Sequence, residues 1–156
     1  SGATGQLLFT SFEAYPLTAD QMIRALAHFT PLETLAKEFA PLWAELCAHS
    51  RIETDELCLN LHIGDARETL PNWQGQANCW FLDGFSPAKN PQLWGSELLK
   101  AVYEHTCDVG SAATYTAAGF VRRNLETAGF TVKRSPGFGR KRHMTHAVKG
   151  DFNAEQ

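Results

Sequence analysis

The chain has 156 residues and a formal net charge of −3, and 44% of its residues are hydrophobic and 20% charged. This balance is typical of a folded globular protein and excludes a chain that is disordered throughout. No apolar run approaches the ~20 residues that a membrane-spanning helix needs. The first residues also lack the basic cluster that opens a signal peptide. We therefore expect a cytoplasmic protein that does not bind membranes.

The cysteines are widely spaced and do not form the closely spaced pairs of a metal site, so no metal is expected. Cys58 and Cys79 lie inside apolar runs, and both are predicted to be buried free thiols.

The N-terminal part of the chain is predicted to contain two strands separated by helices. Residues 7–13 are apolar and aromatic, as in a strand. Thr18 and Gln21 have the spacing of a capping box and open a helix. Residues 31–49 read as more helix, in which Pro41 marks a break or a new start. Residues 57–63 alternate strictly between apolar and other residues, which indicates a second strand.

The C-terminal part continues the alternation of strand and helix. The predicted strands cover residues 77–82, 111–116, 131–134 and 143–149, and the last two are expected to pair as an antiparallel hairpin. The first of them is a continuous apolar run, as expected of a buried parallel strand. A helix over residues 95–106 is expected to be capped by Ser96, and a helix over residues 118–130 to be closed by Gly129. The alternation predicts an α/β fold with parallel strands.

Three acidic residues follow three of these strands. Glu13 ends the first, Asp65 follows the second, and Asp83 follows the third. Ligands bind at the carboxyl ends of parallel strands, so all three are expected at one edge of the sheet. The alternative for each acid is a structural role as a helix cap or turn former.

The three positions suit a cofactor that contains adenosine. Glu13 can accept hydrogen bonds from a ribose diol, and Asp65 can accept one from the exocyclic amine of adenine. Asp83 follows the third strand, beside a loop with polar and aromatic residues, and is expected where the chemistry occurs.

The C-terminal third is strongly basic within an acidic chain. Residues 119–149 hold one acid, Glu126, and eight basic residues: Arg122, Arg123, Lys133, Arg134, Arg140, Lys141, Arg142 and Lys149. This bias favours an anionic partner. The alternative is a solvated basic face.

Five segments, in this order, closely resemble one family of enzymes: "SFEAYPL", "GDARETLP", "FLDGFSPAKNPQLW", "TYTAAGFVRRNLETAGF" and "GFGRKRHM". The family is the methyltransferase domain of MnmC, which acts in bacterial tRNA 5-methylaminomethyl-2-thiouridine biosynthesis. The resemblance covers nearly the whole chain. It implies a Rossmann-like, class I methyltransferase sheet with helices on both faces, and S-adenosylmethionine as the cofactor.

The resemblance also implies a reaction and partners. The family methylates the amine of 5-aminomethyl-(2-thio)uridine at the wobble position of the tRNA anticodon. In many bacteria the domain is fused to an FAD-dependent oxidase. We therefore expect residues 1–150 to form a partial methyltransferase domain and residues 151–156 to form a tail that begins a linker to such a domain.

One family motif has no counterpart in the sequence. No segment matches the glycine-rich loop, similar to "GFGTGLNF", that cradles the methionine part of the cofactor in the family. The chain is therefore expected to lack the first strand, this loop and the first helix.

The resemblance assigns roles to individual residues. Glu13, Asp65, Ala66 and Asp83 are expected to bind the cofactor. Asp83 is also expected to orient the amine or take its proton, and Phe85 or Trp94 to offer a ring face to the base. The residues expected to contact RNA are Lys89, Asn90, Trp94, Arg122, Arg123, Phe138, Arg140, Lys141 and Arg142. Asn90 alternatively only shapes the turn, and Trp94 alternatively belongs to the core.

Two other functions stay open at this point. One is methylation of a small molecule on the same fold, which the basic C-terminal third disfavours. The other is a non-catalytic RNA-binding fragment, which the absent glycine-rich loop keeps open.

Overall fold

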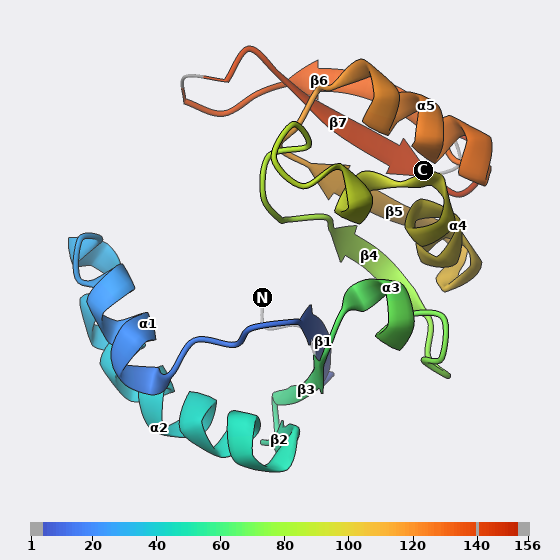
Figure 1. Ribbon diagram of the computed structural model, residues 1–156. Helices are drawn as coiled ribbons and strands as arrows, with labels where there is room; N and C mark the ends of the chain where they lie inside the picture. Colours follow the sequence, from blue (N-terminus) through green and yellow to red (C-terminus); the bar gives the residue numbers. More distant parts are fainter. Residues whose placement is uncertain (1–4, 140, 153–156) are drawn as a thin grey trace. The chain divides into compact units, whose positions relative to one another are not determined.

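The computed structural model describes residues 5–139 and 141–152. The chain divides into two compact units, Ser1–Thr69 and Leu70–Gln156, each built from a small sheet with helices (Figure 1). This confirms the predicted α/β class. No helix among the described residues is long and apolar enough to cross a membrane.

The first unit contains a three-stranded sheet in the order β1-β3-β2. Its elements in chain order are β1 (Leu7–Glu13), α1 (Ala19–Leu26), the short helix η1 (Thr30–Leu32), α2 (Glu33–His49), β2 (Arg51–Glu53), β3 (Leu57–Ile63) and α3 (Ala66–Thr69). Strands β1 and β3 are parallel, as predicted, and β2 pairs antiparallel with the other side of β3. The short elements β2 and α3 were not predicted from the sequence.

Helix α1 begins at the predicted capping box. The backbone N–H of Gln21 donates to the Thr18 hydroxyl at 3.2 Å, and the backbone N–H of Thr18 donates to the Gln21 side chain at 2.8 Å. These bonds satisfy two donors that a helix N-terminus would otherwise leave open.

Helix α2 runs through Pro41 without a break, so the predicted interruption there is wrong. Pro41 lies on the exposed side of the helix. A proline removes one intrahelical hydrogen bond and clashes with the preceding turn. The opposite side of α2 packs on the sheet in a core formed by Leu46, Ile52, Leu59 and Leu61. The burial of this apolar face therefore outweighs the local cost of the proline.

The second unit contains a four-stranded sheet in the order β4-β5-β7-β6. Its elements are β4 (Ala77–Phe81), the short helix η2 (Pro91–Trp94), α4 (Ser96–Glu104), β5 (Thr106–Thr114), α5 (Gly119–Ala128), β6 (Thr131–Pro136) and β7 (His143–Val148). Strands β4 and β5 are parallel, and β7 pairs antiparallel with both β5 and β6. The predicted hairpin of the last two strands is confirmed.

The core of the second unit lies between its helices and its sheet. Helices α4 and α5 contact each other (Figure 1). Leu99 of α4, Val121 and Leu125 of α5, and Ala112 and Ala147 of the sheet are each at most 2% exposed. This core fixes the strand ends from which the loops of the candidate site emerge.

The two predicted helix boundaries in this unit have different outcomes. Ser96 is the first residue of α4 rather than its cap, because Gly95 occupies the capping position and no side chain caps the helix. Gly129 does close α5, with a left-handed backbone (φ 118°). A Cβ added at Gly129 would also lie 2.8 Å from the ring of Tyr103. This position therefore needs glycine for two separate reasons.

The predicted burial of β4 is wrong. Among the described residues β4 pairs only with β5, so its other edge is open. Cys79 and Phe81, two residues apart, share one face of β4, and this face is uncovered within the described residues, since Cys79 is exposed and Phe81 is 77% exposed. Cys58, by contrast, is buried as predicted. The continuous apolar run correctly indicated a parallel strand, but it did not reveal whether both faces of that strand are covered.

Gly129→Ala should destabilise the protein more than Gly150→Ala. Gly150 has the same φ of 118°, but a Cβ there meets nothing within 4 Å. We expect about 1 kcal/mol of destabilisation from backbone strain alone at Gly150, and about 3 kcal/mol at Gly129, where the Tyr103 ring adds a clash. Urea unfolding of both variants measures this difference, and equal losses would show that the ring moves aside without cost.

Candidate functional site

Two of the predicted acids lie at the same edge of the first sheet. Strands β1 and β3 are parallel neighbours in which Glu13 is the register partner of Ile63. The backbone N–H of Gly64 donates to the carbonyl of Glu13 at 3.0 Å, which continues the pairing one residue further. Asp65 follows directly, so parallel pairing brings both carboxylates to the carboxyl ends of adjacent strands.

The carboxylate of Glu13 is half-buried and only partly used. The Ser11 hydroxyl donates to its Oε1 at 3.0 Å, and within the described residues no donor is recorded for Oε2. An acceptor held at a strand end with one oxygen open is suited to a diol. The structure therefore keeps this predicted role available to Glu13.

The carboxylate of Asp65 is occupied by its neighbour Arg67. Its Oδ1 accepts from the backbone N–H of Arg67 at 2.9 Å and from Nε of the guanidinium at 3.0 Å, and the two side chains form an ion pair. These hydrogen bonds lower the pKa of Asp65 from 3.8 to about 2. Asp65 therefore also caps α3, the structural role considered as the alternative, and Ala66 is the first residue of that helix.

The third acid, Asp83, lies in the second unit on an ordered loop. Strand pairing extends past β4, because the backbone N–H of Leu82 donates to Ala113 at 2.9 Å. Asp83 is exposed, and its Oδ1 accepts from the backbone N–H of Gly84 at 2.8 Å. A Cβ on Gly84 would lie 2.3 Å from the side chain of Leu93. The loop therefore approaches η2 closely and presents the carboxylate to solvent.

The side chain of Trp94 holds the backbone of this loop in place. It is 2% exposed, and its indole N–H donates to the carbonyl of Phe85 at 3.0 Å. The predicted contact of Trp94 with RNA is therefore wrong in this structure, because a buried ring has no free face for a base. Phe85 itself is 76% exposed. Its ring is the open aromatic surface next to Asp83.

The rest of the loop is a compact turn. The carbonyl of Ser86 accepts from the backbone N–H groups of Lys89 at 2.8 Å and Asn90 at 3.0 Å. Lys89 is exposed and Asn90 is half-buried. Asn90 thus takes part in the turn through its backbone, which leaves its predicted contact with RNA a prediction, and the side chain of Lys89 is free to reach a ligand.

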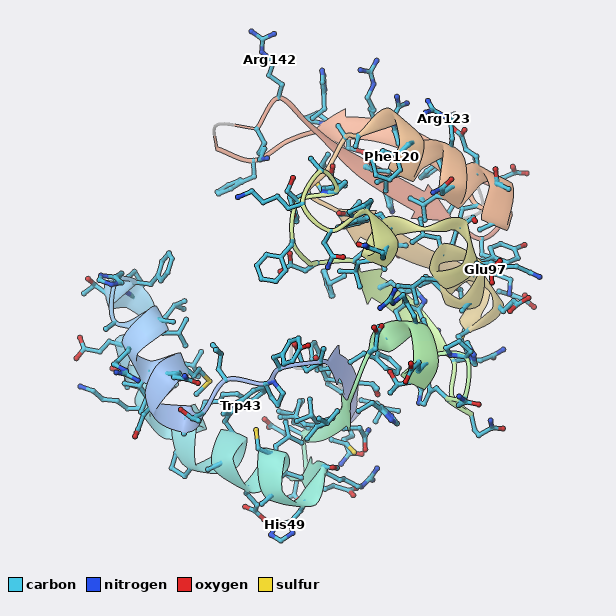
Figure 2. The ribbon with its side chains drawn as sticks, viewed as in Figure 1. Trp43, His49, Glu97, Phe120, Arg123 and Arg142 are labelled. Carbon is cyan, nitrogen blue, oxygen red and sulfur yellow. The ribbon has the colours of Figure 1, made fainter. Side chains whose placement is uncertain are left out.

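The β6–β7 hairpin presents basic and aromatic side chains at its tip. Two backbone hydrogen bonds close its loop. The N–H of Gly137 donates to the carbonyl of Arg142 at 3.1 Å, and the N–H of Lys141 donates to the carbonyl of Phe138 at 3.2 Å. Phe138 is 95% exposed, and Arg142 projects away from the sheet (Figure 2). Arg140, also predicted to contact RNA, lies outside the described residues.

The two arginines of α5 differ in burial. Arg123 is exposed and extends from the helix into solvent (Figure 2). Arg122 is half-buried, and its Nε is enclosed without a hydrogen-bond partner among the described residues. Only Arg123 is therefore freely accessible to a phosphate, while Arg122 keeps part of its guanidinium inside the unit.

The described residues contain no group of three or more His, Cys, Asp or Glu side chains that could hold a metal ion.

Sequence reasoning missed two residues that hold the loop of Asp83. The hydroxyl of Tyr115 donates to the carbonyl of Gly84, and the side-chain amide of Asn124 donates to the carbonyl of Trp94 at 2.9 Å. The only available signal was the place of Tyr115 near the end of the predicted strand over residues 111–116.

Comparison with known protein families gives a match over residues 30–150 to the S-adenosyl-L-methionine-dependent methyltransferase model Methyltransf_30. The chain belongs to this methyltransferase family. The matched residues include Asp65, Asp83, the loop that follows each of them, and the hairpin. The resemblance found in the sequence is thereby confirmed.

Relatives of this methyltransferase chain include bifunctional proteins of tRNA 5-methylaminomethyl-2-thiouridine biosynthesis, named MnmC. The protein from Chromohalobacter salexigens is 42% identical over 144 residues, which cover 91% of this chain and 21% of that protein. The protein from Caulobacter vibrioides is 42% identical over 146 residues, covering 92% and 25%. The chain thus spans about a quarter or less of the length of these curated relatives.

Solved structures show the same fold. The crystal structure of MNMC2 from Aquifex aeolicus matches with a TM-score of 0.65 and 25% identity, covering 91% of this chain and 53% of that one. A methyltransferase from Pyrococcus furiosus matches with a TM-score of 0.52 and 16% identity, covering 92% and 75%. The second match supports the Rossmann-like fold alone.

The family uses S-adenosyl-L-methionine, and the acceptors in the structure fit it. The cofactor carries a ribose diol and an adenine amine, which are both hydrogen-bond donors. Glu13 offers an open carboxylate oxygen, whereas an adenine amine would have to share the Asp65 carboxylate with Arg67. Acceptors of this kind at parallel strand ends are the arrangement that binds nucleotides in α/β sheets.

Arg67→Gln should raise the pKa of Asp65 from about 2 toward its ordinary value of 3.8. The rise should be incomplete, because the backbone N–H of residue 67 still donates to Oδ1. An NMR titration of the Asp65 carboxyl carbon measures the pKa in both proteins. The ion pair Lys37–Glu33 provides the control, since Lys37→Gln lies elsewhere and should leave Asp65 unchanged. An unaltered Asp65 in Arg67→Gln would mean that the guanidinium contact does not persist in solution.

Proposed function

We propose that this chain performs the methyl transfer of wobble-uridine modification in tRNA. The methyl group of S-adenosylmethionine passes to the amine of 5-aminomethyl-(2-thio)uridine and gives 5-methylaminomethyl-(2-thio)uridine. The relatives at 42% identity are named for biosynthesis of this nucleoside. The observation that carries the proposal is a loop with an exposed acid and an exposed aromatic ring, Asp83 and Phe85, in the same unit as a basic hairpin tip.

In this proposal four residues bind the cofactor. Glu13 accepts from the ribose diol, Asp65 and Ala66 lie at the adenine, and Asp83 lies at the reacting end. S-adenosylmethionine supplies an electrophilic methyl group when it is bound. Within the first unit the chain contributes acceptors positioned at strand ends, which lowers the cost of orienting the cofactor.

Asp83 prepares the amine for attack. A primary alkylamine is mostly protonated at neutral pH, and its lone pair is then blocked. The Asp83 carboxylate accepts a hydrogen bond from the amine and orients it, and takes the proton that the amine gives up when the methyl group is transferred. One of its oxygens is already fixed by the N–H of Gly84. That contact sets the direction in which the other oxygen points.

The RNA is held by aromatic and basic side chains. A uridine turned out of the anticodon loop stacks on the exposed ring of Phe85 or Phe138. Lys89, Lys141 and Arg142 are exposed and bind phosphates. We assign Arg123 to the same surface, with Arg122 and Arg140 as further candidates.

We further propose that residues 1–150 act as one methyltransferase domain, since the family match crosses both units. Residues 151–156 would begin a linker to an FAD-dependent oxidase, in line with relatives that are named bifunctional. A tRNA substrate places the reaction in the cytoplasm.

One assay separates this function from the two alternatives. Methyl transfer from labelled S-adenosylmethionine is measured with tRNA that carries the 5-aminomethyl group, with unmodified tRNA and with small alkylamines. Transfer to the modified tRNA alone supports the proposal. Transfer to small amines would favour a small-molecule methyltransferase, and tRNA binding without cofactor binding would indicate a non-catalytic role.

Asp83→Asn should lower the rate of methyl transfer by roughly 100-fold, the usual scale for losing acid–base or orienting help. The amide keeps an oxygen that accepts from Gly84 but cannot take the proton of the amine. Cofactor affinity should change much less than the rate, because the amide oxygen can still accept a hydrogen bond from the cofactor. Asp108→Asn removes an exposed acid elsewhere in the same unit and should remain fully active. Near-normal activity of Asp83→Asn would reduce Asp83 to a loop-shaping role.

Removing two cations from the hairpin should weaken tRNA binding and flatten its salt dependence. Each lost contact to a single-stranded phosphate lowers the slope of log affinity against log salt by ~0.7. The double variant Lys141→Ala with Arg142→Ala should therefore lose about 1.4. The control is Lys37→Ala with Lys100→Ala, which removes the same charge from two exposed ion pairs.

Binding is measured at several salt concentrations for both double variants. The control variant should keep the slope of the unaltered protein. Phe138→Ala should weaken binding and leave the slope unchanged, because it removes a stacking surface rather than a charge. An equal loss of slope in the hairpin and control variants would mean that net charge alone matters and that the hairpin is not the RNA contact.

A further inference from the structure

Tyr115 connects the carboxyl end of β5 to the loop that carries Asp83. It directly follows Thr114, the last residue of β5, and its side chain is half-buried. Its hydroxyl donates to the carbonyl oxygen of Gly84 at 2.5 Å. One rigid side chain therefore spans from a strand in the interior of the sheet to the peptide next to Asp83.

The ring of Tyr115 also packs on the second anchor of this loop. It meets the ring of Trp94 edge to face, with centroids 6.5 Å apart and an interplanar angle of 90°. Trp94 donates in turn to the carbonyl of Phe85 at 3.0 Å. Two consecutive carbonyls, those of Gly84 and Phe85, thus each accept from an aromatic side chain. This double contact fixes the loop immediately after Asp83.

A third contact joins Tyr115 to the basic hairpin. Nζ of Lys141 lies 5.3 Å from the centre of the Tyr115 ring, within the range of a cation–π interaction. The hairpin tip and the loop of Asp83 therefore meet on the same tyrosine. The hydroxyl of Tyr115 contacts the loop, and its ring contacts both Trp94 and Lys141.

We propose that Tyr115 is a positioning residue with two separable parts. Its hydroxyl sets the orientation of Asp83 and Phe85 for the chemical step. Its ring sets the place of Lys141 for binding of the RNA. This inference rests on the proposed function for its kinetic consequences, while its structural consequence is independent of that function.

The two parts predict a split between kcat and KM. Tyr115→Phe removes only the hydroxyl and should lower kcat about 10-fold, since small misplacements of reacting groups are costly. Its KM for tRNA should stay within about twofold, because the ring still holds Lys141. Tyr115→Leu removes the ring as well, and should combine the same loss in kcat with a KM raised about fivefold.

The control is Tyr103→Phe. Tyr103 is another half-buried tyrosine of the second unit, and its ring packs on Phe130 rather than on the loop. Loss of its hydroxyl should change neither kcat nor KM. Thermal unfolding of all three variants checks that the kinetic losses do not follow from loss of the fold.

Hydrogen–deuterium exchange tests the positioning without any assay of activity. In Tyr115→Phe, a peptide that covers residues 82–90 should exchange about 10-fold faster than in the unaltered protein. A peptide within α4, residues 96–104, should be unchanged, as should both peptides in Tyr103→Phe.

The outcomes separate the two proposals. If the unaltered protein fails to methylate modified tRNA but Tyr115→Phe loosens residues 82–90, the proposed function is wrong and the positioning role stands. If Tyr115→Phe leaves both the exchange of this loop and kcat unchanged, the positioning role is overturned. Equal changes in kcat and KM for Phe and Leu at this position would overturn the separation into hydroxyl and ring.

Discussion

The burial of one indole ring determines the shape of the candidate active loop. Trp94 is 2% exposed, and its indole N–H donates to the backbone carbonyl of Phe85. The side-chain amide of Asn124 in α5 donates to the backbone carbonyl of Trp94. A buried N–H needs an acceptor, so the packed ring holds the loop backbone at one place. The packed core thereby fixes the backbone next to Asp83, whose own side chain is exposed. The exposed carboxylate keeps one orientation because the next two backbone carbonyls, those of Gly84 and Phe85, are held by hydrogen bonds.

Local signals in the sequence predicted the fold where neighbouring residues decide the structure. The capping box of Thr18 with Gln21 and the closing glycine Gly129 are contacts within one or two turns, and both are present. The predictions at Pro41 and Cys79 failed because the outcome depends on residues far along the chain. Packing of α2 on its sheet carries the helix past the proline, and the exposure of Cys79 depends on whether another element covers its face of β4.

The candidate site was predictable to a similar extent. Acids after parallel strands were found from the strand pattern alone, and Glu13 and Asp65 do lie at the ends of paired strands. The ion pair of Asp65 with Arg67 was missed, although the two residues are only two positions apart. Their spacing alone does not reveal how the loop folds. The role of Tyr115 was also missed, since its contact with Gly84 spans 31 residues of sequence. No periodicity or motif encodes such a contact.

The irregular middle of β5 has a consequence for how this sheet tolerates change. Ala77 of β4 pairs with Thr106 and Cys79 pairs with Ser111, so a step of two residues on one strand matches five on the other. The extra residues form a bulge in which Val109 has a positive φ of 56°. Beyond the bulge, pairing to both neighbours fixes the register of residues 111–114. Insertions or deletions near the exposed Asp108 should therefore be absorbed within the bulge, and the end of the strand, which leads into Tyr115, should keep its geometry.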